Sequence, residues 1–266
     1  MHYNSHRLLE EEFEMSKRYY VIFLVLLLGF FVTNAMAESK PVVYYTFDEL
    51  GQTVKDASGN GNDGTPKNSI KLNDNGKFSK CFEFDGVNSY VELQRVIQDS
   101  FTLMAWIKTD KPGLAGTQAY QGSGVIWSDV AGTANDFVFA LLDKKLSFFC
   151  GNPDTSVNSD NDVVTGDWVH IAATRDLNKG EIAIYINGKK DKSIAHGNKG
   201  PLNALPTIAI GGNVLDNRYY TGLIDEVKIF DVALTEAEIQ KASSSLAAVD
   251  ARSKLATTWA SLKAVY

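Results

Sequence analysis

Short apolar runs separated by turn residues dominate the chain from Pro41 to Phe230. In a β-strand, side chains alternate between two faces, so every second residue shares a face. The run Phe101 to Lys108 is apolar on both faces, which indicates a central strand covered on both sides. In Glu181 to Ile186 an isoleucine stands at every second position, and Asn187-Gly188 then favours a two-residue hairpin turn. This pattern predicts an all-β sandwich rather than an α/β fold.

The expected strands are short, and a helix is expected only after the last of them. The strands are 42–47, 82–84, 89–93, 101–108, 125–128, 137–142, 146–150, 168–174, 181–186, 207–210 and 222–230. Beyond them, Thr235 and Glu238 have the spacing of a capping box, in which each side chain accepts a hydrogen bond from the other residue's backbone. A helix should therefore begin there.

The last expected strand places a carboxylate among apolar residues. Strict alternation puts Asp225 on the same face as Leu223, Val227 and Ile229. A carboxylate that faces a core is costly unless a partner compensates its charge. By the same alternation Glu226 points to the opposite face. The two carboxylates are therefore not expected to flank one bond, as glycoside hydrolysis requires.

The N-terminus has the pattern of a secretory signal peptide. The apolar run Val21 to Val32 follows two basic residues and precedes Ala35-Met36-Ala37, a small-x-small cleavage site. A membrane-spanning helix needs about 20 residues, so we expect a signal peptide over residues 1–37, with an uncleaved anchor as the alternative. Because several glutamates precede it, Met15 is an alternative start. The mature chain is then secreted, either extracellular or periplasmic.

The pattern changes again near Ser243. The apolar residues beyond it share one helical face and are Leu255, Trp259, Leu262 and Tyr266. We expect residues 243–266 to form a helical tail that packs back on the domain or is partly ordered, since short isolated helices are marginal in water. An attachment or partner helix is the alternative. These boundaries leave 38–242 as one domain.

Charge and cysteine content narrow the range of partners. The formal net charge of −6 argues against nucleic acid, and after signal cleavage no membrane association is expected. Cys81 and Cys150 each lie in a strand-like run. Because secretion permits oxidation, we expect a disulfide between them. Two separate buried thiols are the alternative.

Several motifs stand in a set order along the chain. They are Tyr44–Glu49, Asp56–Gly64, Phe84–Glu92, Phe101–Ile107, Trp168–Ala173, Ile184–Gly188, Ile210–Gly212 and Gly222–Val227. Together they resemble the LamG-like jelly rolls of the concanavalin A-like superfamily, over about residues 41–241. The resemblance implies an antiparallel jelly-roll sandwich of two sheets, one of them concave, in which the first and last strands pair.

The resemblance also implies a structural calcium ion at one end of the sandwich. The pairing of the first and last strands would bring Asp48 near Asp225, beneath the loop Asp56–Gly64. Carboxylate, amide and carbonyl oxygens are the ligands that calcium prefers. The expected ligands are Asp48, Asn62 and Asp225. Hydrogen bonds from loop backbone N–H groups to Asp225 are the alternative that needs no metal.

A second group of residues suits a sugar. Aromatic rings can stack on a sugar, and amide and carboxylate groups can bind its hydroxyls. The candidates are Trp127, Asp129, Asn213, Asp216, Tyr219 and Tyr220. In the pentraxins the matching stretch carries ligand-binding calcium, but only Asp216 of that acidic cluster is present here. An ordinary polar loop on the sandwich rim is the alternative.

These features together predict a secreted module that binds rather than catalyses. The expected partner is a glycan or an extracellular glycoprotein surface, by resemblance to the family. A structural or adhesion domain without a sugar site is the first alternative. A glycoside hydrolase is less favoured, because no Glu-x-Asp-x-Glu run, nucleophile elbow or His-rich metal motif is present in the sequence.

Overall fold

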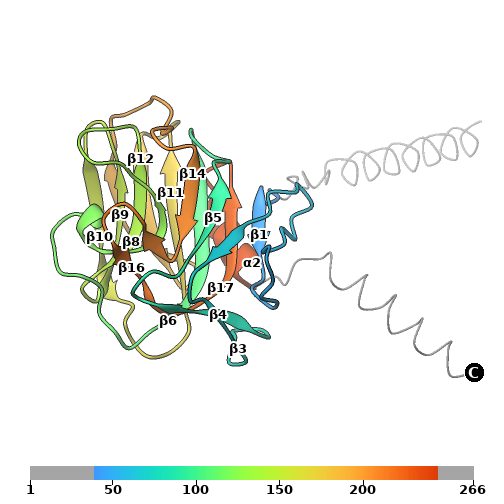
Figure 1. Cartoon of the computed structure of the whole chain (residues 1–266). Helices are drawn as coiled ribbons and strands as arrows, with labels where there is room; N and C mark the ends of the chain where they lie inside the picture. The colour runs from blue at the N-terminus through green and yellow to red at the C-terminus, as the bar shows by residue number, and fades with distance from the viewer. Residues whose placement is uncertain (1–38, 245–266) are drawn as a thin grey trace, which may run out of the picture. The chain divides into compact units, whose positions relative to one another are not determined.

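The computed structural model describes residues 39–244, which form a sandwich of two β-sheets (Figure 1). The expected signal peptide (1–37) and all but the first two residues of the expected tail (243–266) lie outside the described residues. Pairing between the strands is antiparallel, except for one bridge between Tyr219 and Gly124. No helix within residues 39–244 has the length and apolar character that a membrane span requires.

The eight-stranded sheet has the order β13-β12-β11-β6-β17-β4-β3, and β1 pairs with β17. Its strands are β1 (Val43–Tyr45), β3 (Lys71–Asn73), β4 (Cys81–Asp85), β6 (Phe101–Lys108), β11 (Val169–Asp176), β12 (Glu181–Ile186), β13 (Lys189–Ala195) and β17 (Thr221–Phe230). The predicted jelly-roll sandwich and the predicted pairing of the first and last strands are confirmed, since Val43 lies opposite Ile229.

The nine-stranded sheet has the order β10-β9-β8-β7-β14-β5-β2, and the short hairpin β15–β16 joins it at β7. Its strands are β2 (Thr65–Lys67), β5 (Tyr90–Gln94), β7 (Ser123–Ser128), β8 (Phe137–Leu142), β9 (Lys145–Cys150), β10 (Thr155–Asp162), β14 (Thr207–Ile210), β15 (Gly212–Asn213) and β16 (Arg218–Tyr219). A 3-10 turn, η1 (Ala119–Gln121), precedes β7.

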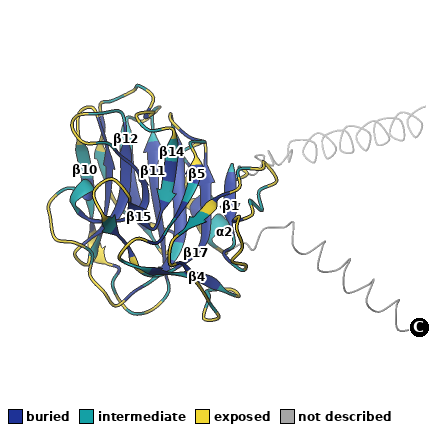
Figure 2. Cartoon of the chain, viewed as in Figure 1, coloured by how far each residue is buried: buried dark blue, intermediate teal, exposed yellow. Residues whose placement is uncertain are grey.

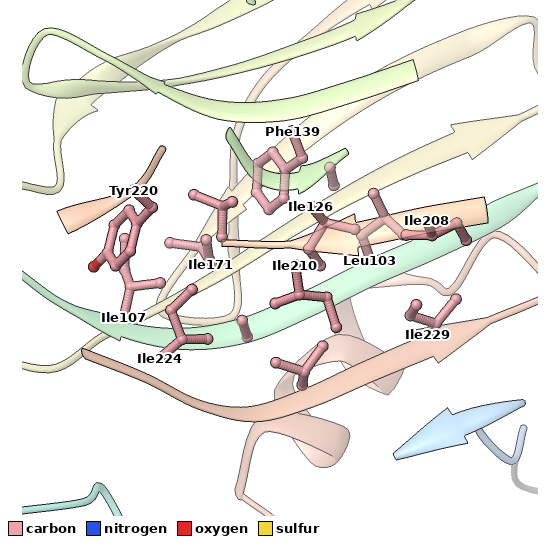
Figure 3. Packing of buried hydrophobic residues seen from close by; sticks show 14 of the residues in the cluster. Leu103, Ile107, Ile126, Phe139, Ile171, Ile208, Ile210, Tyr220, Ile224 and Ile229 are labelled. Carbon is pink, nitrogen blue, oxygen red and sulfur yellow. The ribbon is translucent and has the colours of Figure 1, made fainter. Parts of the chain in front are cut away.

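The main core fills the space between the two sheets. Figure 3 shows side chains from both sheets that meet there, among them Leu103 and Ile107 of β6 and Ile126 of β7. Met104, on the other face of β6, belongs to a separate apolar cluster beneath the C-terminal helix. The two-faced character predicted for this strand is therefore confirmed. In Figure 2 the strands are mostly buried and the exposed residues gather in the loops.

The open edge of β1 is covered by the loop at 56–62. Asp56 accepts a hydrogen bond from the backbone N–H of Tyr44 (3.0 Å), and Ala57 donates its N–H to the Tyr44 carbonyl (2.8 Å). The Asn62 side-chain amide donates to the Val42 carbonyl (2.8 Å). The loop thus supplies the hydrogen bonds that a further strand would make, which protects an otherwise exposed sheet edge.

A bulge in β17 changes the face on which its side chains lie. The register with β6 shifts after Asp225, and Glu226 has a positive φ of 52°. Ile224 and Val227 consequently both belong to the core, whereas Asp225 lies opposite Trp106 on the outer face of the sheet. The expected alternation, which placed Asp225 on the core face, is wrong because a bulge inserts one extra residue into the strand.

Glu226 lies on this outer face as well. It accepts a hydrogen bond from the Tyr44 hydroxyl, and its Oε2 lies 3.9 Å from the ammonium of Lys228. The Lys228 ammonium also lies 4.8 Å from the centroid of the Tyr44 ring. The expectation that Asp225 and Glu226 point to opposite faces is therefore wrong for the same reason. The bulge gathers both carboxylates on the outer side of the sheet.

The C-terminal helix α2 (Glu236–Ser244) begins where the sequence predicts. Thr235 donates its N–H to the Glu238 carboxylate (2.7 Å), and Glu238 donates its N–H to the Thr235 hydroxyl (3.3 Å). These two reciprocal bonds make the predicted capping box.

Side chains of the eight-stranded sheet hold the other end of α2. Lys228 donates to the carbonyl of Ala242 (2.8 Å), and Trp106 donates its indole N–H to the carbonyl of Ser243 (3.3 Å). Both acceptors belong to the last turn, where a cation also interacts favourably with the helix dipole. Lys228 therefore stabilises the docked helix although it is almost fully buried.

The two cysteines lie on different sheets. Cys81 is on β4 and Cys150 on β9, and both are free, buried thiols. The expected disulfide between Cys81 and Cys150 is therefore a wrong prediction, and the alternative of two separate thiols describes the structure. Burial raises the pKa of the Cys81 thiol to about 12. It consequently stays protonated and behaves as a small apolar group.

His170 is a buried titratable group whose pKa differs between the folded and the unfolded chain. Its ring packs edge-on against Trp106, and its Nδ1 has no hydrogen-bond partner among the described residues. Burial, helped by the nearby charge of Lys228, lowers the pKa of His170 to about 3. The unfolded chain, with an ordinary pKa of about 6.5, binds the proton more readily than the folded one.

The contribution of His170 to the free energy of unfolding should therefore decrease as the pH falls from 7 to 4. His170 contributes a slope of at most ~1.4 kcal/mol for each pH unit. His170→Phe keeps a ring against Trp106 but cannot be protonated, so it should reduce the slope measured by urea unfolding at several pH values. His196→Gln should also reduce the slope, because burial lowers the pKa of His196 as well. Identical slopes in the wild type and His170→Phe would refute this role.

Candidate functional site

The candidate site lies on the outer face of the nine-stranded sheet, near the end of β7. Trp127 pairs with Val138 of β8 and Ala209 of β14. It belongs to a small apolar cluster, separate from the main core, that includes Phe149 and Ala119 of η1. Asp129 follows immediately after β7, two residues beyond Trp127. Asp129 therefore lies next to this buried apolar cluster.

The β15–β16 hairpin beside this cluster has an ordered tip. The Asn213 side-chain oxygen Oδ1 accepts hydrogen bonds from the backbone N–H groups of Leu215 (2.9 Å) and Asp216 (3.2 Å). The Asn213 amide group in turn donates to the Asp216 carboxylate (2.9 Å). Arg218 lies 3.8 Å from Asp216 and donates to the carbonyl of Tyr120, which links the hairpin to η1. The tip presents Leu215, which is 61% exposed.

Four aspartates lie near one another here and form what we call the acidic rim: Asp129, Asp136, Asp154 and Asp216. Asp129 hydrogen bonds to Asp136, and both are buried. Burial raises the pKa of both carboxyl groups, and the charges of Asp216 and Asp154 raise that of Asp129 further. The bond between the pair raises the pKa of Asp129 and lowers that of Asp136, so Asp129 holds the shared proton.

Two polar atoms at this site are incompletely paired. Asp136 uses Oδ2 to accept the N–H of Val130 (3.1 Å), and apart from the proton shared with Asp129 its Oδ1 has no donor among the described residues. The buried indole N–H of Trp127 is also unpaired. A Cβ added to Gly151 would lie 2.0 Å from the Ala134 carbonyl oxygen and 2.3 Å from Asp136 Oδ1, so this close packing requires glycine. Unpaired buried polar groups are costly and call for a water, an ion or a ligand group.

Two buried arginines hold the loops around the rim. Arg95 donates to the Ser128 hydroxyl (2.6 Å) and to backbone carbonyls of Leu202 and Leu205. Arg175 donates to four carbonyls, those of Gln98, Asp99, Asn198 and Gly200. Both guanidinium groups therefore serve as positioning groups, because most of their N–H donors bind the protein itself; Arg175 Nε has no partner among the described residues.

Some of the predicted ligand residues lie together in the structure, and others are buried where a ligand cannot stack on them. Asp129, Asn213 and Asp216 lie in one region. Tyr220 is fully buried on the core side, where it packs edge-on against Phe84, so its predicted stacking role is wrong. Figure 3 shows Tyr220 among the core side chains.

The other two predicted stacking residues are also covered. Trp127 is 2% exposed and Tyr219 is 9% exposed, which leaves little ring surface for a sugar to stack on. The indole N–H of Trp127 is buried and has no partner among the described residues. Sequence reasoning missed Asp136 and Asp154, since a single carboxylate before a strand or within a turn carries no spacing signal.

The expected calcium ligands already have protein partners. Asp225 accepts the backbone N–H of Lys77 (2.7 Å) and of Glu226 (2.8 Å), one at each oxygen. Asp48 accepts the N–H of Lys80 (3.1 Å). Both carboxylates therefore hold the turn between β3 and β4. Burial first, and then the charge of Glu226, raises the pKa of Asp225 to about 7.

Asn62 is engaged elsewhere. Its amide donates to Val42, its backbone N–H donates to Asp56 (2.9 Å), and its carbonyl accepts the hydroxyl of Tyr45 (2.6 Å). The donor set Asp48, Asn62 and Asp225 therefore does not fit a calcium ion, whose six to eight oxygens must be free to coordinate it. Within residues 39–244, no three His, Cys, Asp or Glu side chains are grouped so as to hold a metal ion.

Comparisons with known proteins agree with this architecture. A family model, Laminin_G_3, described as the concanavalin A-like lectin/glucanases superfamily, matches residues 85–240. The sequence matches no curated protein. Domain 4 of AbnA, a GH43 extracellular arabinanase from Geobacillus stearothermophilus solved with arabinotriose, is 24% identical with a TM-score of 0.61. The match covers 77% of this chain and 98% of that domain.

Toxin binding domains have the same fold over part of their length. The binding domain of Paraclostridial Mosquitocidal Protein 1 is 19% identical with a TM-score of 0.59, and the match covers 76% of this chain and 51% of that domain. The binding domain of Botulinum Neurotoxin DC, solved with SialylT, is 18% identical with a TM-score of 0.57, at 76% and 50% coverage. At these identities the likeness concerns the fold alone. Because the family model spans more than half of its residues, the chain belongs to the concanavalin A-like lectin/glucanase superfamily.

Proposed function

We propose that this chain is a secreted, non-catalytic module that binds a glycan at the acidic rim. The observation that carries the proposal is the pair of unpaired buried atoms, Asp136 Oδ1 and the indole N–H of Trp127. A sugar hydroxyl both donates and accepts hydrogen bonds, so it can serve either atom. The similar fold of a domain solved with arabinotriose supports this class of ligand. Secretion rests on the expected signal peptide over residues 1–37.

Neither carboxylate pair suits glycoside hydrolysis. The two carboxyl groups of a glycosidase stand about 5 to 9.5 Å apart, on either side of the scissile bond. Asp129 and Asp136 hydrogen bond to each other and leave no room for a sugar between them. Asp225 and Glu226 are 1% and 5% exposed, and both hydrogen bond to the protein. These arrangements favour binding over catalysis.

A protein-binding or adhesion role without a sugar site is the second candidate. It is favoured by Leu215, an exposed apolar residue at the tip of the ordered β15–β16 hairpin. An apolar side chain held in place at a loop tip can enter a pocket of an extracellular protein. This role predicts that Leu215→Ser, rather than changes at the rim, abolishes binding.

We further propose that Asp48, Asn62 and Asp225 act by hydrogen bonding, without calcium. Asp225 holds the β3–β4 turn through backbone N–H groups on both of its oxygens. Asn62 helps to hold the loop that covers the edge of β1. In this proposal the charge of Asp225 is compensated by N–H donors of the chain itself.

Substitutions at the two unpaired atoms test the glycan proposal. Trp127→Phe removes the N–H while keeping most of the ring, and Asp136→Asn removes the charge of the acceptor. Each should weaken binding to the glycans retained on an array by about tenfold, the effect of losing one hydrogen bond to a polar or charged group. Asp74→Asn is the matched control, because Asp74 is exposed on the β3–β4 turn.

Melting curves should accompany these binding measurements to establish that each variant is folded. The proposal fails if the wild type retains no glycan, with or without added calcium. It also fails if Trp127→Phe and Asp136→Asn bind as tightly as Asp74→Asn does.

Chelation tests the proposal for Asp225. EDTA should leave the melting temperature of the protein unchanged. Asp225→Asn should lower the melting temperature equally with and without calcium, since it weakens acceptors of two buried hydrogen bonds at a cost of about 1 to 3 kcal/mol. A melting temperature that falls in EDTA and returns with calcium would contradict the metal-free role.

A further inference from the structure

A row of five side chains crosses the outer face of the eight-stranded sheet, away from the acidic rim. The residues that lie directly opposite one another are Lys71 and Glu83 (β3–β4), Glu83 and Leu223 (β4–β17), and Leu223 and Lys108 (β17–β6). Trp168 comes directly before β11 and extends the row beyond Lys108. Each of the five has a sequence neighbour in the main core, so strand alternation directs all five outward. We call these five residues the basic strip.

The basic strip is at least partly exposed along its whole length. The next row of the same face is covered, since Asp225 there is 1% exposed. It is covered by the β3–β4 turn, which Asp225 holds by accepting the N–H of Lys77 (2.7 Å). The Phe78 ring lies edge-on to Trp106 at 6.2 Å, and the Lys77 ammonium lies 4.0 Å from a Trp106 ring centroid. Phe78, which is 39% exposed, therefore forms a step beside the strip.

The strip is positively charged although the chain as a whole is negative. Lys71 and Lys108 oppose the single carboxylate of Glu83, which already accepts the side-chain amide of Asn73 (2.9 Å). Lys77 adds a third ammonium group at the step. Within residues 39–244, none of these three lysines forms an ion pair. Their ammonium groups are therefore available to a ligand.

Carboxylates in the adjoining turns have lysine partners of their own. Asp74, in the β3–β4 turn, lies 3.4 Å from the ammonium of Lys80. Asp110, which follows β6, lies 3.6 Å from the ammonium of Lys111. These two carboxylates are compensated locally, so the positive charge of the strip remains.

An acidic saccharide fits this surface better than a protein does. Free ammonium groups bind carboxylate and sulfate oxygens, and the half-buried Trp168 ring offers an apolar face and a polar N–H together. The centres of protein interfaces are depleted in lysine, whereas Lys108 lies in the middle region of the strip. The C-terminal residues 245–266 carry one aspartate against Arg252, Lys254 and Lys263, so their charge has the same sign as the strip.

We propose that the basic strip binds an acidic oligosaccharide, with Lys71 and Lys108 on its anionic groups and Trp168 beneath a sugar ring. Neighbouring strands lie about 4.8 Å apart, so these two lysines, three strands apart, are separated by roughly 14 Å at the backbone. The ligand therefore needs at least two anionic groups on different sugar units. This site is separate from the acidic rim and does not rest on the function proposed there.

The test uses oligosaccharides that differ only in charge. Oligogalacturonate is compared with its methyl ester, and a sulfated galactan oligosaccharide with its desulfated form, so that carboxylate and sulfate recognition are distinguished. At low salt the full chain should bind at least one anionic ligand at least about tenfold more tightly than its neutral counterpart. The difference should shrink at about 0.5 M salt, because exposed charges are then screened.

Substitutions locate the site. Lys71→Gln and Lys108→Gln keep most of the side-chain length but remove the charge, so each should weaken binding of the anionic ligand about three- to tenfold. Lys144→Gln is the matched control, because Lys144 is an exposed lysine in the β8–β9 turn of the other sheet. Melting curves establish that all three variants are folded. In a ¹H–¹⁵N spectrum the anionic ligand should shift the indole signal of Trp168, assigned by substitution, and leave that of Trp127 in place.

Three results would overturn the proposal. They are equal binding of the anionic and neutral ligands, equal binding by Lys108→Gln and Lys144→Gln, and a shift of the Trp127 signal without a shift of the Trp168 signal. Neutral glycans serve as the readout of the acidic rim in the same experiments, and both strip variants should bind them as the wild type does. Failure at the strip is thereby distinguished from failure at the rim.

Discussion

The bulge in β17 is the constraint on which the eight-stranded sheet depends. One extra residue at Glu226, held by a positive φ, moves Asp225, Glu226 and Lys228 to the outer face and returns Val227 to the core. On that face Asp225 binds the β3–β4 turn and Lys228 binds the last turn of α2. Without the bulge, strict alternation would direct either Asp225 or both Glu226 and Lys228 into the space between the sheets, where a buried charge is costly.

The same molecule contains a second set of buried polar groups that is incompletely paired. Around Asp225 the buried carboxylate oxygens have protein donors, so this cluster belongs to the scaffold. At Asp136 one oxygen has no donor among the described residues apart from the proton shared with Asp129, and the indole N–H of Trp127 lacks an acceptor there. Since a folded protein pairs most of its buried polar atoms, unpaired ones point to a ligand or ordered water. This contrast places the candidate function at the rim rather than at the strand junction.

Much of the scaffold could be predicted from the sequence. The alternation in β6 identified both of its faces, and the spacing of Thr235 and Glu238 located the start of α2. The bulge could not be predicted, because an inserted residue is defined by the pairing with β6 and leaves no local signal at Glu226. The proton-sharing contact of Asp129 with Asp136 depends on how the chain folds between β7 and β8.

The central claim is that the unpaired indole N–H of Trp127 meets the ligand. In a two-dimensional ¹H–¹⁵N spectrum, the indole signals of Trp127 and Trp106 can be assigned by substitution and followed as a neutral oligosaccharide such as arabinotriose is added. Trp106 is an internal control, because its N–H already donates to Ser243. The account predicts that the Trp127 signal shifts with saturation while the Trp106 signal stays in place. Saturable binding that leaves the Trp127 indole unmoved would contradict it.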